Sequence, residues 1–474
     1  MPWLEKLRAA WRARRYSILI SCVVTLLGTL LYAHTYLAEA RTPLAQFLDS
    51  IEAKTYDTRF RVRGRTAPSP NIVIVAIDQA TLERLGSWPF SRHEYVRLLD
   101  QLSAQGAKVV GFDINFPKPD AKSGLVAVEQ ARQAYLARTP SPRRDADYLA
   151  QLEEMARAAD TDAALAEAIA RADNVVLGYF FFPSRAEVRF VDEKAQLEAD
   201  NLLTFSSYST RGMNDPQGQP PPALKEVFSG EQGYLAETNL PAFTQAANFS
   251  VGYFNFSADA DGIFRRAPLT LAYRGAWHDE QGPMNFYPSL DIQILRRYRN
   301  VPEHEMLLLT NKAGLEAVQL GELLIPTDPE GRMLIHYQGG PYTYPQVSLA
   351  DVLEEKTPPG MFRDKIVLVG PTALAIGDFG PTPFAESFHS GVEIHANVLD
   401  TILARRFIHR GDREKLIDLA LILLFGLGLG GFLAFARPAW TTVLALTSLL
   451  LFLFATYSAL AWFAMWLNVV LPGS

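Results

Sequence analysis

Seven side chains near the ends of apolar runs could bind a ligand or take part in chemistry. They are Asp78, Trp88, Arg92, Asp113, Thr372, Asp378 and His395. In open α/β sheets, ligands bind beyond the carboxyl ends of the strands, and carboxylate oxygens suit hard cations. Asp78, Asp113 and Asp378 could therefore converge on a cation or on a polar ligand. Gly370, shortly before Thr372, would allow the backbone to approach such a ligand closely.

For most of these residues, a structural role is the alternative to ligand binding. Asp78 could cap a helix that starts near Ala80, which is a frequent use of aspartate. Trp88 and Arg92 could form a lip that contacts a ligand, or they could pack on the body at the start of a helix. His395 lies among apolar residues of an expected helix, which favours a buried structural histidine over a metal ligand. The sequence therefore identifies no particular metal.

Motifs of well-known catalytic and cofactor sites are missing from the sequence. It contains no G-x-x-x-x-G-K-[ST], no H-E-x-x-H, no C-x-x-C and no G-x-S-x-G. The single cysteine, Cys22, excludes an internal disulfide. The formal net charge is -6, and no basic stripe with interleaved aromatic residues indicates nucleic-acid binding. We therefore expect no enzyme active site, no cofactor and no nucleic-acid partner.

Apolar segments at both ends of the chain are long enough to cross a membrane. A bilayer-crossing helix needs about 20 mostly apolar residues. The expected divisions are a basic N-terminus (1–16), a first span (17–37), a polar body (38–410), a second span (416–436) and a third span with the start of a further one (439–474). A lipid membrane is therefore an expected partner, and we expect the chain to continue into another span.

The charges near the first span predict the side of the membrane on which the body lies. The segment 1–16 is rich in Lys and Arg, and basic segments tend to stay in the cytoplasm. The body would then lie outside the cytoplasm, although a second basic cluster at 405–415 opposes this orientation. The segment 38–40 matches a signal-peptide cleavage site. Because the apolar stretch before it is longer than usual for a signal peptide, a retained anchor is favoured over a cleaved one.

The polar body has the pattern of an α/β protein. Continuous apolar runs predict strands buried on both faces, as in parallel sheets. These runs are 71–77, 108–116, 174–182 and 365–370. Amphipathic helices are expected at 94–105, 162–172, 287–298 and 392–404. We therefore expect a layered α/β sandwich around a mostly parallel sheet, with right-handed crossovers and transmembrane helices beside it.

Two hairpins and two less regular segments are expected to decorate this sandwich. Turn signals at 259–262 and 328–331 predict β-hairpins, in which each turn joins two paired strands. The stretch 205–240 is rich in Pro, Gly, Ser and Asn and is expected to be loop. The polar segment 117–160 is expected to be inserted or flexible.

Two weak signals favour a homodimer. The stretch 38–60 has apolar residues at helical spacing and is predicted to continue the first span as a stalk. Gly426 and Gly430 form a G-x-x-x-G pattern in the second span, which lets another helix approach closely. The alternative is that glycine is simply common in membrane helices.

Several short motifs follow one another along the body. They are the runs 73–78, 111–116, 365–370 and 391–396, together with Leu82, Gly86, Trp88-Pro89, Arg92, Leu99, Asp261-Gly262, Arg265, Pro268, Asp378 and Thr382-Pro383. This set resembles the type-two CHASE domain, a cyclase/histidine-kinase-associated sensory extracellular domain. The resemblance covers roughly 37–408, and the motifs stand in the order that the family shows. The segment 117–160 departs from the pattern because it is longer than the family's usual connector.

The resemblance implies an extracytoplasmic sensor that is usually followed by three spans and a cytoplasmic effector. That effector is often a class III adenylate or guanylate cyclase and sometimes a kinase, and none is found within these 474 residues. We therefore expect a signal-transduction sensor of the inner or plasma membrane, with a periplasmic body and an unknown ligand. The alternatives are a membrane-tethered hydrolase and an envelope-assembly binding protein. Loss of a hydrolytic activity on replacing Asp78 and Asp113 by Asn would favour the hydrolase.

Overall fold

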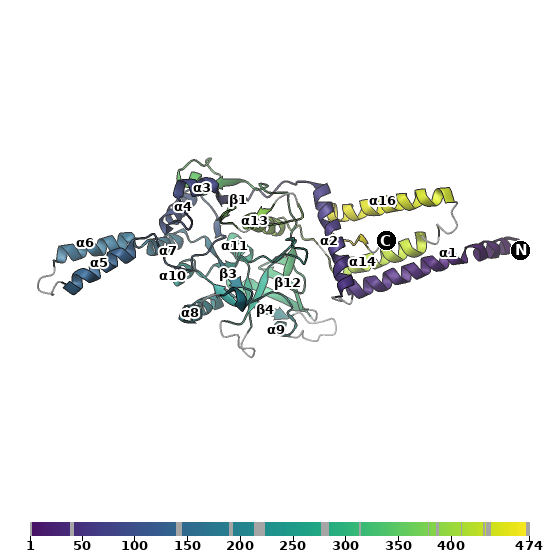
Figure 1. Cartoon of the computed structure of the whole chain (residues 1–474), viewed down its shortest axis with the longest axis horizontal. Helices are drawn as coiled ribbons and strands as arrows, with labels where there is room; N and C mark the ends of the chain where they lie inside the picture. The colour runs from purple at the N-terminus through teal and green to yellow at the C-terminus, as the bar shows by residue number, and fades with distance from the viewer. Residues whose placement is uncertain are drawn as a thin grey trace.

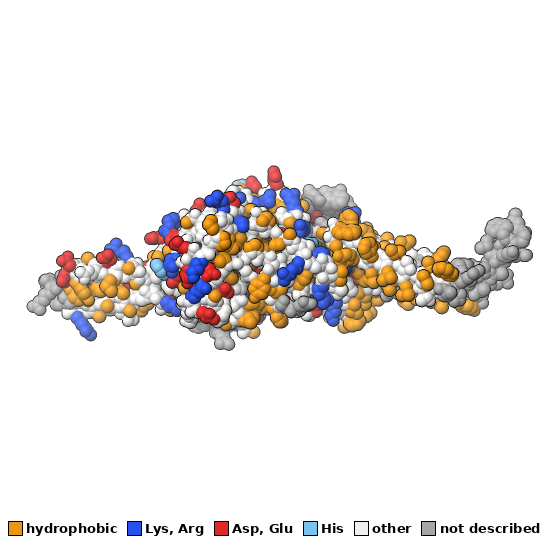
Figure 2. All heavy atoms as spheres, turned by 90° about the horizontal axis from the view of Figure 1, so that it is seen from above, with side chains coloured by type: hydrophobic (Ala, Val, Ile, Leu, Met, Phe, Trp, Pro, Cys, Tyr) orange, Lys and Arg blue, Asp and Glu red, His pale blue; other side chains and the backbone are white. Residues whose placement is uncertain are grey.

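The computed structural model has a rounded body, with a group of helices extending from one end (Figure 1). It describes residues 2–37, 42–138, 145–188, 193–212, 223–275, 284–311, 314–377, 379–384, 388–408, 410–429, 432 and 438–470. Figure 2 shows charged side chains over the body and hydrophobic side chains gathered over the extending helices. The described surface of the extending helices is thus mostly apolar, whereas the body exposes charged and hydrophobic side chains together.

A mostly parallel sheet forms the centre of the body, as predicted. Its strands are β1 (Ile72–Ile77), β2 (Val109–Phe112), β3 (Val175–Phe182), β6 (Leu235–Glu237), β7 (Val251–Tyr253), β15 (Gln346–Ser348) and β16 (Ile366–Pro371). The strand order is β15-β1-β16-β2-β3-β6, and β7 also pairs with β3. Every pair in this sheet is parallel except β3 with β6. The expected strand 108–116 ends early, because the chain leaves the sheet after Phe112.

Helices cover both faces of this sheet. One face carries α3 (Gln79–Leu85), α4 (Arg92–Ala104), α7 (Thr161–Ala172), α10 (Pro241–Ala246) and α12 (Leu349–Leu353), and the other carries α11 (Leu290–Tyr298) and α13 (Gly391–Leu403). The side chains of β1 alternate between two hydrophobic cores. Ile72 and Ile74 pack with α11 and α13, whereas Val73 and Val75 pack with α4 and α7. This alternation follows from the two-residue repeat of a strand, and it gives the expected layered α/β sandwich.

Both predicted hairpins are wrong. The two tight turns form, because the amide of Gly262 donates to Asp259 O and that of Gly331 donates to Asp328 O. The strands beside them pair elsewhere: β7 joins the central sheet, and β8 (Arg266–Pro268) pairs with β14 (Arg332–Leu334). The strands that follow the two turns therefore pair with each other. A turn signal determines where the chain reverses but not which strand becomes its neighbour.

Smaller sheets complete the body. One contains β4 (Ser209–Gly212), β11 (Met306–Asn311), β12 (Gly314–Leu320) and β13 (Leu323–Pro326), and another contains β5 (Gln232–Gly233), β9 (Thr270–Tyr273) and β10 (Asn285–Pro288). The remaining elements include α8 (Glu193–Leu203), α9 (Leu224–Val227), β17 (Phe379–Gly380) and β18 (His389–Ser390). The prediction of loop for 205–240 was wrong in part, because β4, α9, β5 and β6 fall within it.

The segment expected to be inserted or flexible contains two helices. α5 (Leu125–Arg138) and α6 (Ala146–Ala159) lie side by side and project from the end of the body opposite the extending helices (Figure 1). No residue of α5 is buried. This pair of helices is therefore an addition to the body and not part of its core.

The extending helices are α1 (Pro2–Tyr32), which continues as a π-helix (Ala33–Leu37), α14 (Asp412–Leu423), which continues as a π-helix (Leu424–Leu429), and α16 (Pro438–Phe463). Among the described residues, two helices are long and apolar enough to cross a membrane, Ile18–Leu37 and Trp440–Phe463. Both expose large apolar side chains, such as Leu27 and Leu450. The end of the predicted span 416–436 lies outside the described residues.

The predicted stalk is a separate helix that changes direction. α2 (Pro43–Arg63) starts at the N-cap Thr42 with Pro43 in its first turn, and it crosses the body-side ends of α1, α14 and α16 (Figure 1). Residues 38–41, between α1 and α2, lie outside the described residues. α2 therefore does not continue α1; it lies between the helices and the body.

One of the two glycines that favoured a homodimer is used inside the chain. A methyl group on Gly426 would overlap the side chain of Thr25 on α1, and Ser21 Oγ donates to Gly426 O at 2.6 Å. Gly430 lies outside the described residues. The close approach at Gly426 therefore joins α1 to the segment after α14, as expected of a small residue at a helix–helix contact.

A substitution at Gly252 can test the close packing of β7 against α11. A Cβ atom there would lie 2.6 Å from Ser289 O and 2.7 Å from Leu290 Cα, so the backbone itself would have to shift. We expect Gly252→Ala to lower the free energy of unfolding by about 1–3 kcal/mol, measured by urea unfolding. Gly340→Ala is the control, because the nearest atom to its added methyl is Arg65 Nη2 at 3.7 Å. Equal stability of the two variants would contradict this account.

Candidate functional site

A cavity of about 820 Å³ opens at the carboxyl ends of β2, β3 and β16. Asp113 and Ile114 follow β2 directly, Phe180 lies near the end of β3, and Pro371 ends β16. Trp88 and Arg92, from the start of α4 and the loop before it, also line the cavity. Three of the predicted site residues, Trp88, Arg92 and Asp113, are therefore brought together at the edge where parallel sheets bind ligands.

Aromatic rings form much of the cavity wall. They are Trp88, Phe180, Phe254, Phe256, Phe264 and Phe379. Two of the rings lie against glycine: a Cβ atom on Gly178 would lie 2.5 Å from the ring of Phe254, and one on Gly380 would overlap the ring of Phe264. The position of these rings thus depends on the absence of a side chain behind them.

A buried histidine lies between two carboxylates, one of which, Asp113, lines the cavity. His395 Nδ1 is 3.0 Å from Asp291 Oδ2, and His395 Nε2 is 3.5 Å from Asp113 Oδ1. Burial alone would lower the pKa of His395, but the two carboxylates raise it to about 10. The ring of Phe256 covers the imidazole, with 4.5 Å between ring centres. His395 is therefore a charged structural residue at neutral pH, in line with the structural alternative for this position.

At the rim, Arg92 supports the loop that closes the cavity. Its Nη2 donates to Lys118 O at 2.7 Å, and its Nε pairs with Asp162 at 3.3 Å. Asp120, in the same loop, accepts hydrogen bonds from the amides of Arg92 and Lys122. Burial opposes ionisation of Asp120, but these bonds lower its pKa. Arg92 thus has the structural role at a helix start, and it also shapes the rim.

Asp78 and Thr372 lie in a different recess. It has a volume of about 680 Å³ and lies at the ends of β1, β15 and β16. Asp78 Oδ1 accepts hydrogen bonds from Thr81 N at 2.9 Å and from Ser348 Oγ at 2.8 Å, so it caps α3. Asp78 and Asp113 therefore line separate hollows.

The predicted convergence of carboxylates on a cation receives no support from the described residues. Among them, no group of three or more His, Cys, Asp or Glu side chains could hold a metal ion. Asp378, the third predicted carboxylate, lies outside the described residues. The hydrolase alternative relied on Asp78 and Asp113 acting at strand ends, and here the two are not neighbours.

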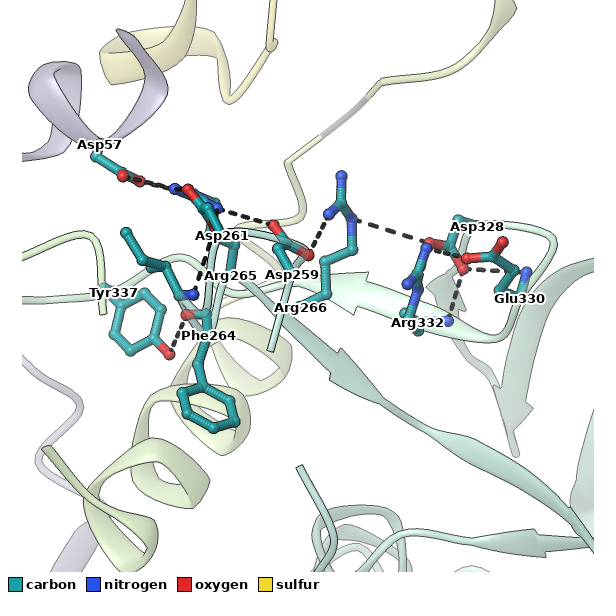
Figure 3. A network of polar contacts seen from close by, with 11 residues as sticks. Asp57, Asp259, Asp261, Phe264, Arg265, Arg266, Asp328, Glu330, Arg332 and Tyr337 are labelled. Carbon is teal, nitrogen blue, oxygen red and sulfur yellow. Dashed lines mark hydrogen bonds and ion pairs between the residues drawn. The ribbon is translucent and has the colours of Figure 1, made fainter. Parts of the chain in front are cut away.

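A buried arginine joins the body to α2 (Figure 3). Arg265 is fully buried, and its Nε and Nη2 donate to the two carboxylate oxygens of Asp57 on α2, at 2.8 and 2.7 Å. It also binds Asp259 at 3.1 Å and Asp261 at 2.8 Å, within the turn that precedes it. Paired hydrogen bonds between Arg and a carboxylate fix orientation as well as distance. Arg265 therefore holds α2 at a defined angle to the body.

A second buried acid joins α2 to the segment that follows α16. Glu52 accepts hydrogen bonds from Arg59 Nη2 at 2.8 Å, Trp466 Nε1 at 3.0 Å, Val469 N at 2.7 Å and Val470 N at 3.1 Å. These last three belong to the segment that follows α16. Glu52 thus links α2 to the body-side end of the helical group.

Two further contacts at this junction involve groups that sequence reasoning missed. Asp418 on α14 accepts from Tyr32 Oη on α1 and from Asn468 N, both at 3.0 Å. The guanidinium of Arg410 lies over the rings of Tyr36 and Trp466, at 5.1 and 4.7 Å. The basic cluster at 405–415 therefore includes an arginine that packs the helix ends together.

One sequence signal could have identified Glu52. It lies four residues after Leu48 and four before Tyr56, on the buried stripe of α2, where an acid needs a partner. The sequence gave less reason to expect a buried partner for Asp57 or Asp291, because both apolar and polar residues surround each of them in its helix. Their partners, Arg265 and His395, lie more than 100 residues away.

Comparison with known families identifies the domain. The family model for the CHASE2 domain matches residues 24–433, a stretch that includes the cavity, α2 and Arg265. The chain belongs to the CHASE2 family. CHASE2 domains are extracellular sensory domains of signalling receptors and are not catalytic. No curated protein and no solved structure matches the chain.

The charged state of His395 predicts how the stability of this CHASE2 domain depends on pH. Its pKa in the folded protein, about 10, exceeds the ordinary value of ~6.5. Its stabilisation is therefore complete below pH ~6.5 and is lost as the pH rises toward about 10, by at most about 1.4 kcal/mol per pH unit. We expect urea unfolding of the wild type to show this decline.

The variant His395→Gln separates the pH-dependent stabilisation by His395 from that of other titrating groups. The variant leaves Asp113 and Asp291 without their shared imidazolium, so it should be less stable near neutral pH by about 3–5 kcal/mol. It should also lose the decline in stability at alkaline pH. His304→Gln, which changes an exposed histidine, should behave as the wild type. An equal loss of stability at alkaline pH in His395→Gln would contradict the assignment of this pH dependence to His395.

Proposed function

We propose that this chain is the sensor of a transmembrane receptor, with its body outside the cytoplasm and several helices crossing the inner or plasma membrane. An extracytoplasmic ligand would bind in the aromatic cavity and change the position of α2. The membrane helices would pass that change to a cytoplasmic effector outside this chain, such as a class III adenylate or guanylate cyclase or a kinase.

The observation that carries this proposal is the adjacency of a cavity residue and a junction residue. Phe264 lines the cavity, and the next residue, Arg265, binds Asp57 on α2. The carbonyl of Phe264 also accepts a hydrogen bond from Tyr337 at 2.7 Å, so the backbone here is held on both sides (Figure 3). A ligand that moves the ring of Phe264 would therefore shift the guanidinium that positions α2.

α2 is suited to pass such a shift toward the membrane. Asp57 faces the body, and Glu52 faces the segment that follows α16. The two acids are five residues apart, which places them about 7.5 Å apart along the axis and about 140° apart around it. Because a packed helix moves as a unit, a change at Asp57 would reach Glu52. The ligand can drive this only if it binds the two arrangements with different affinity.

The proposed orientation follows from the N-terminal charges and from the packing of the junction. The basic residues before the first span favour a cytoplasmic N-terminus. The opposing cluster at 405–415 includes Arg410, whose contacts with Tyr36 and Trp466 give it a structural reason to lie on the body side. A homodimer would be the working form, and crosslinking that gave only monomers in the membrane would count against it.

Gly380→Ala tests whether the cavity communicates with the junction. The added methyl would overlap the ring of Phe264 and push it. With the full chain in lipid nanodiscs, we expect hydrogen–deuterium exchange to rise in residues 43–63 and 464–470, at least threefold at the affected amides, which is about 0.7 kcal/mol of local opening.

Two variants control this experiment. Gly340→Ala adds the same methyl where only Arg65 lies near, at 3.7 Å, and should leave exchange unchanged. Arg265→Lys keeps the charge but loses the paired hydrogen bonds to Asp57, so exchange in 43–63 should rise even without a change in the cavity. Unchanged exchange at the junction in Gly380→Ala would refute the proposed communication.

A further inference from the structure

α2 lies where the apolar helices meet the body. Its Leu48 packs with Tyr32 of α1 and Ile422 of α14. The ring of Tyr56 lies 4.4 Å from that of Trp466, which follows α16. Figure 1 shows α2 running across the ends of these helices and not along them. If α1 and α16 cross a membrane, α2 therefore runs along the membrane surface.

Two exposed tryptophans mark the ends of α16. Trp440 and Trp462 are 61% and 69% exposed, and each lies close to one end of the helix. They are about 33 Å apart along the helix axis, close to the ~30 Å of a hydrocarbon core. Exposed tryptophan is typical of the boundary between membrane and water. Because Trp466, shortly after Trp462, contacts α2, α2 would lie at that boundary.

One side of α2 is exposed along the helix. A helix turns by about 100° per residue, so residues three and four apart share a side. All the members of this side are exposed except Ile51, which is half-buried. We call them the outer stripe of α2, and they are Leu44, Phe47, Ile51, Lys54, Thr58, Arg61 and Val62.

The outer stripe carries large apolar side chains beside the helix ends. Leu44 and Phe47 are 53% and 60% exposed, and Val62 is 68% exposed. Leu44 lies about 40° around the helix from Leu48, and Leu48 packs on α1 and α14. The apolar surface of the extending helices therefore continues onto α2.

The acids of α2 lie away from the outer stripe, whereas two bases lie on it. Asp49, Glu52 and Asp57 are about 90° or more from its middle around the helix. Glu52 and Asp57 are also buried. Lys54 and Arg61 are exposed. Apolar residues with bases on one side are typical of a helix that lies on a bilayer, where the bases meet anionic headgroups.

We propose that the outer stripe of α2 lies in the interface of the bilayer that α1 and α16 cross, with its apolar residues at the boundary of the acyl chains and its two bases at anionic headgroups. This inference rests on the proposed function for the membrane placement of α1 and α16. It adds that the helix between the cavity and the membrane helices itself binds lipid. The position of the helix that Arg265 holds would then depend on the bilayer.

A second copy of the chain is the competing occupant of the outer stripe. A contact between two copies related by two-fold symmetry joins the same patch of each. The outer stripe, which lies wholly within the described residues, carries two bases and no acid. Such a contact would therefore bring like charges together, which is unfavourable. A bilayer that contains anionic lipid has the complementary charge.

A nitroxide label tests this placement, because oxygen concentrates in lipid and the complex nickel ethylenediaminediacetate stays in water. Cys22 is the only cysteine, so Cys22→Ser gives a background for single labels. With the full chain in nanodiscs of phosphatidylcholine and phosphatidylglycerol, we expect the oxygen-to-nickel collision ratio at Phe47→Cys to exceed that at Gln46→Cys about threefold. Gln46 is the matched control, because it is also exposed but lies about 160° around the helix from Leu44.

Two further labels give the ratios expected for lipid and for water. Leu450→Cys changes a residue of α16 that is 66% exposed, and Val126→Cys changes a residue of α5 that is 69% exposed. A ratio at Phe47→Cys equal to that at Gln46→Cys or at Val126→Cys would overturn the inference. Low collision with both reagents would mean that protein covers the outer stripe, as a second copy would, and would overturn it too.

The role of the two bases is tested by the lipid that surrounds them. A bimane fluorophore at Val62→Cys, next to Arg61, is quenched by brominated lipids that touch it. We expect brominated phosphatidylglycerol to be preferred over brominated phosphatidylcholine about fivefold. Lys54→Gln combined with Arg61→Gln should abolish this preference. Arg138→Gln combined with Arg157→Gln, which removes two exposed arginines from α5 and α6, should keep it.

Either of two results would overturn the assignment of these bases to anionic headgroups. One is the absence of the preference in the wild type. The other is its persistence when Lys54 and Arg61 are both replaced by Gln.

This inference and the proposed function can fail separately. If Leu450→Cys reads as lipid-facing and Phe47→Cys as water-facing, the proposed membrane placement stands and the inference is wrong. If Leu450→Cys itself reads as water-facing, the membrane placement is wrong and the inference falls with it. If Phe47→Cys reads as lipid-facing but Gly380→Ala leaves exchange at the junction unchanged, the inference stands and the proposed communication is wrong.

Discussion

The buried ion cluster around Arg265 is the interaction on which the arrangement of the whole chain depends. A fully buried guanidinium is costly to desolvate, and its three carboxylate partners offset that cost only when their geometry is good. Two of the partners come from the turn just before it, and the third, Asp57, comes from a helix 208 residues earlier. Because the geometry must be kept, α2 is held at a defined position against the body.

α2 is in turn the support of the helical group. Its other buried acid, Glu52, accepts hydrogen bonds from the segment that follows α16, and Leu48 packs with Tyr32 and Ile422 from α1 and α14. α2 therefore makes two acidic contacts at the junction between the body and the helical group, where Arg266 of the body also lies over the ring of Trp466. Of the two acids, Asp57 binds Arg265, which follows the cavity residue Phe264, and Glu52 binds the segment that follows α16.

The fold followed from the sequence where a local pattern is enough to determine structure. The runs that became β1, β3 and β16 are apolar throughout, which in a chain of this kind indicates strands covered on both faces. α4, α7 and α13 followed from apolar residues at helical spacing. The hairpins were wrong because pairing is decided by the rest of the molecule: β8 pairs with β14, from 66 residues further along, and not with a strand beside its turn.

The sequence predicted several residues of the candidate site but not which of them lie together. Asp78 and Asp113 both follow strands, yet β16 lies between β1 and β2 in the sheet, so the two acids open into different hollows. Phe254, Phe256 and Phe264 carried no signal as cavity residues, because aromatic residues are common in any core. Asp291 and His395 are 104 residues apart, and only the packing of α11 beside α13 brings them into contact.

The sequence by itself determined that this protein has apolar helices at both ends, a parallel-sheet body and the motifs of a CHASE2 domain. These depend on hydrophobic periodicity and on short runs of residues, which are properties of neighbouring positions. The tertiary structure decided which acid meets which base, which rings line one cavity, and that α2 crosses the helix ends where a straight stalk was expected. Such contacts depend on segments far apart in the chain, and their free energy is gained only when the whole fold has brought those segments together.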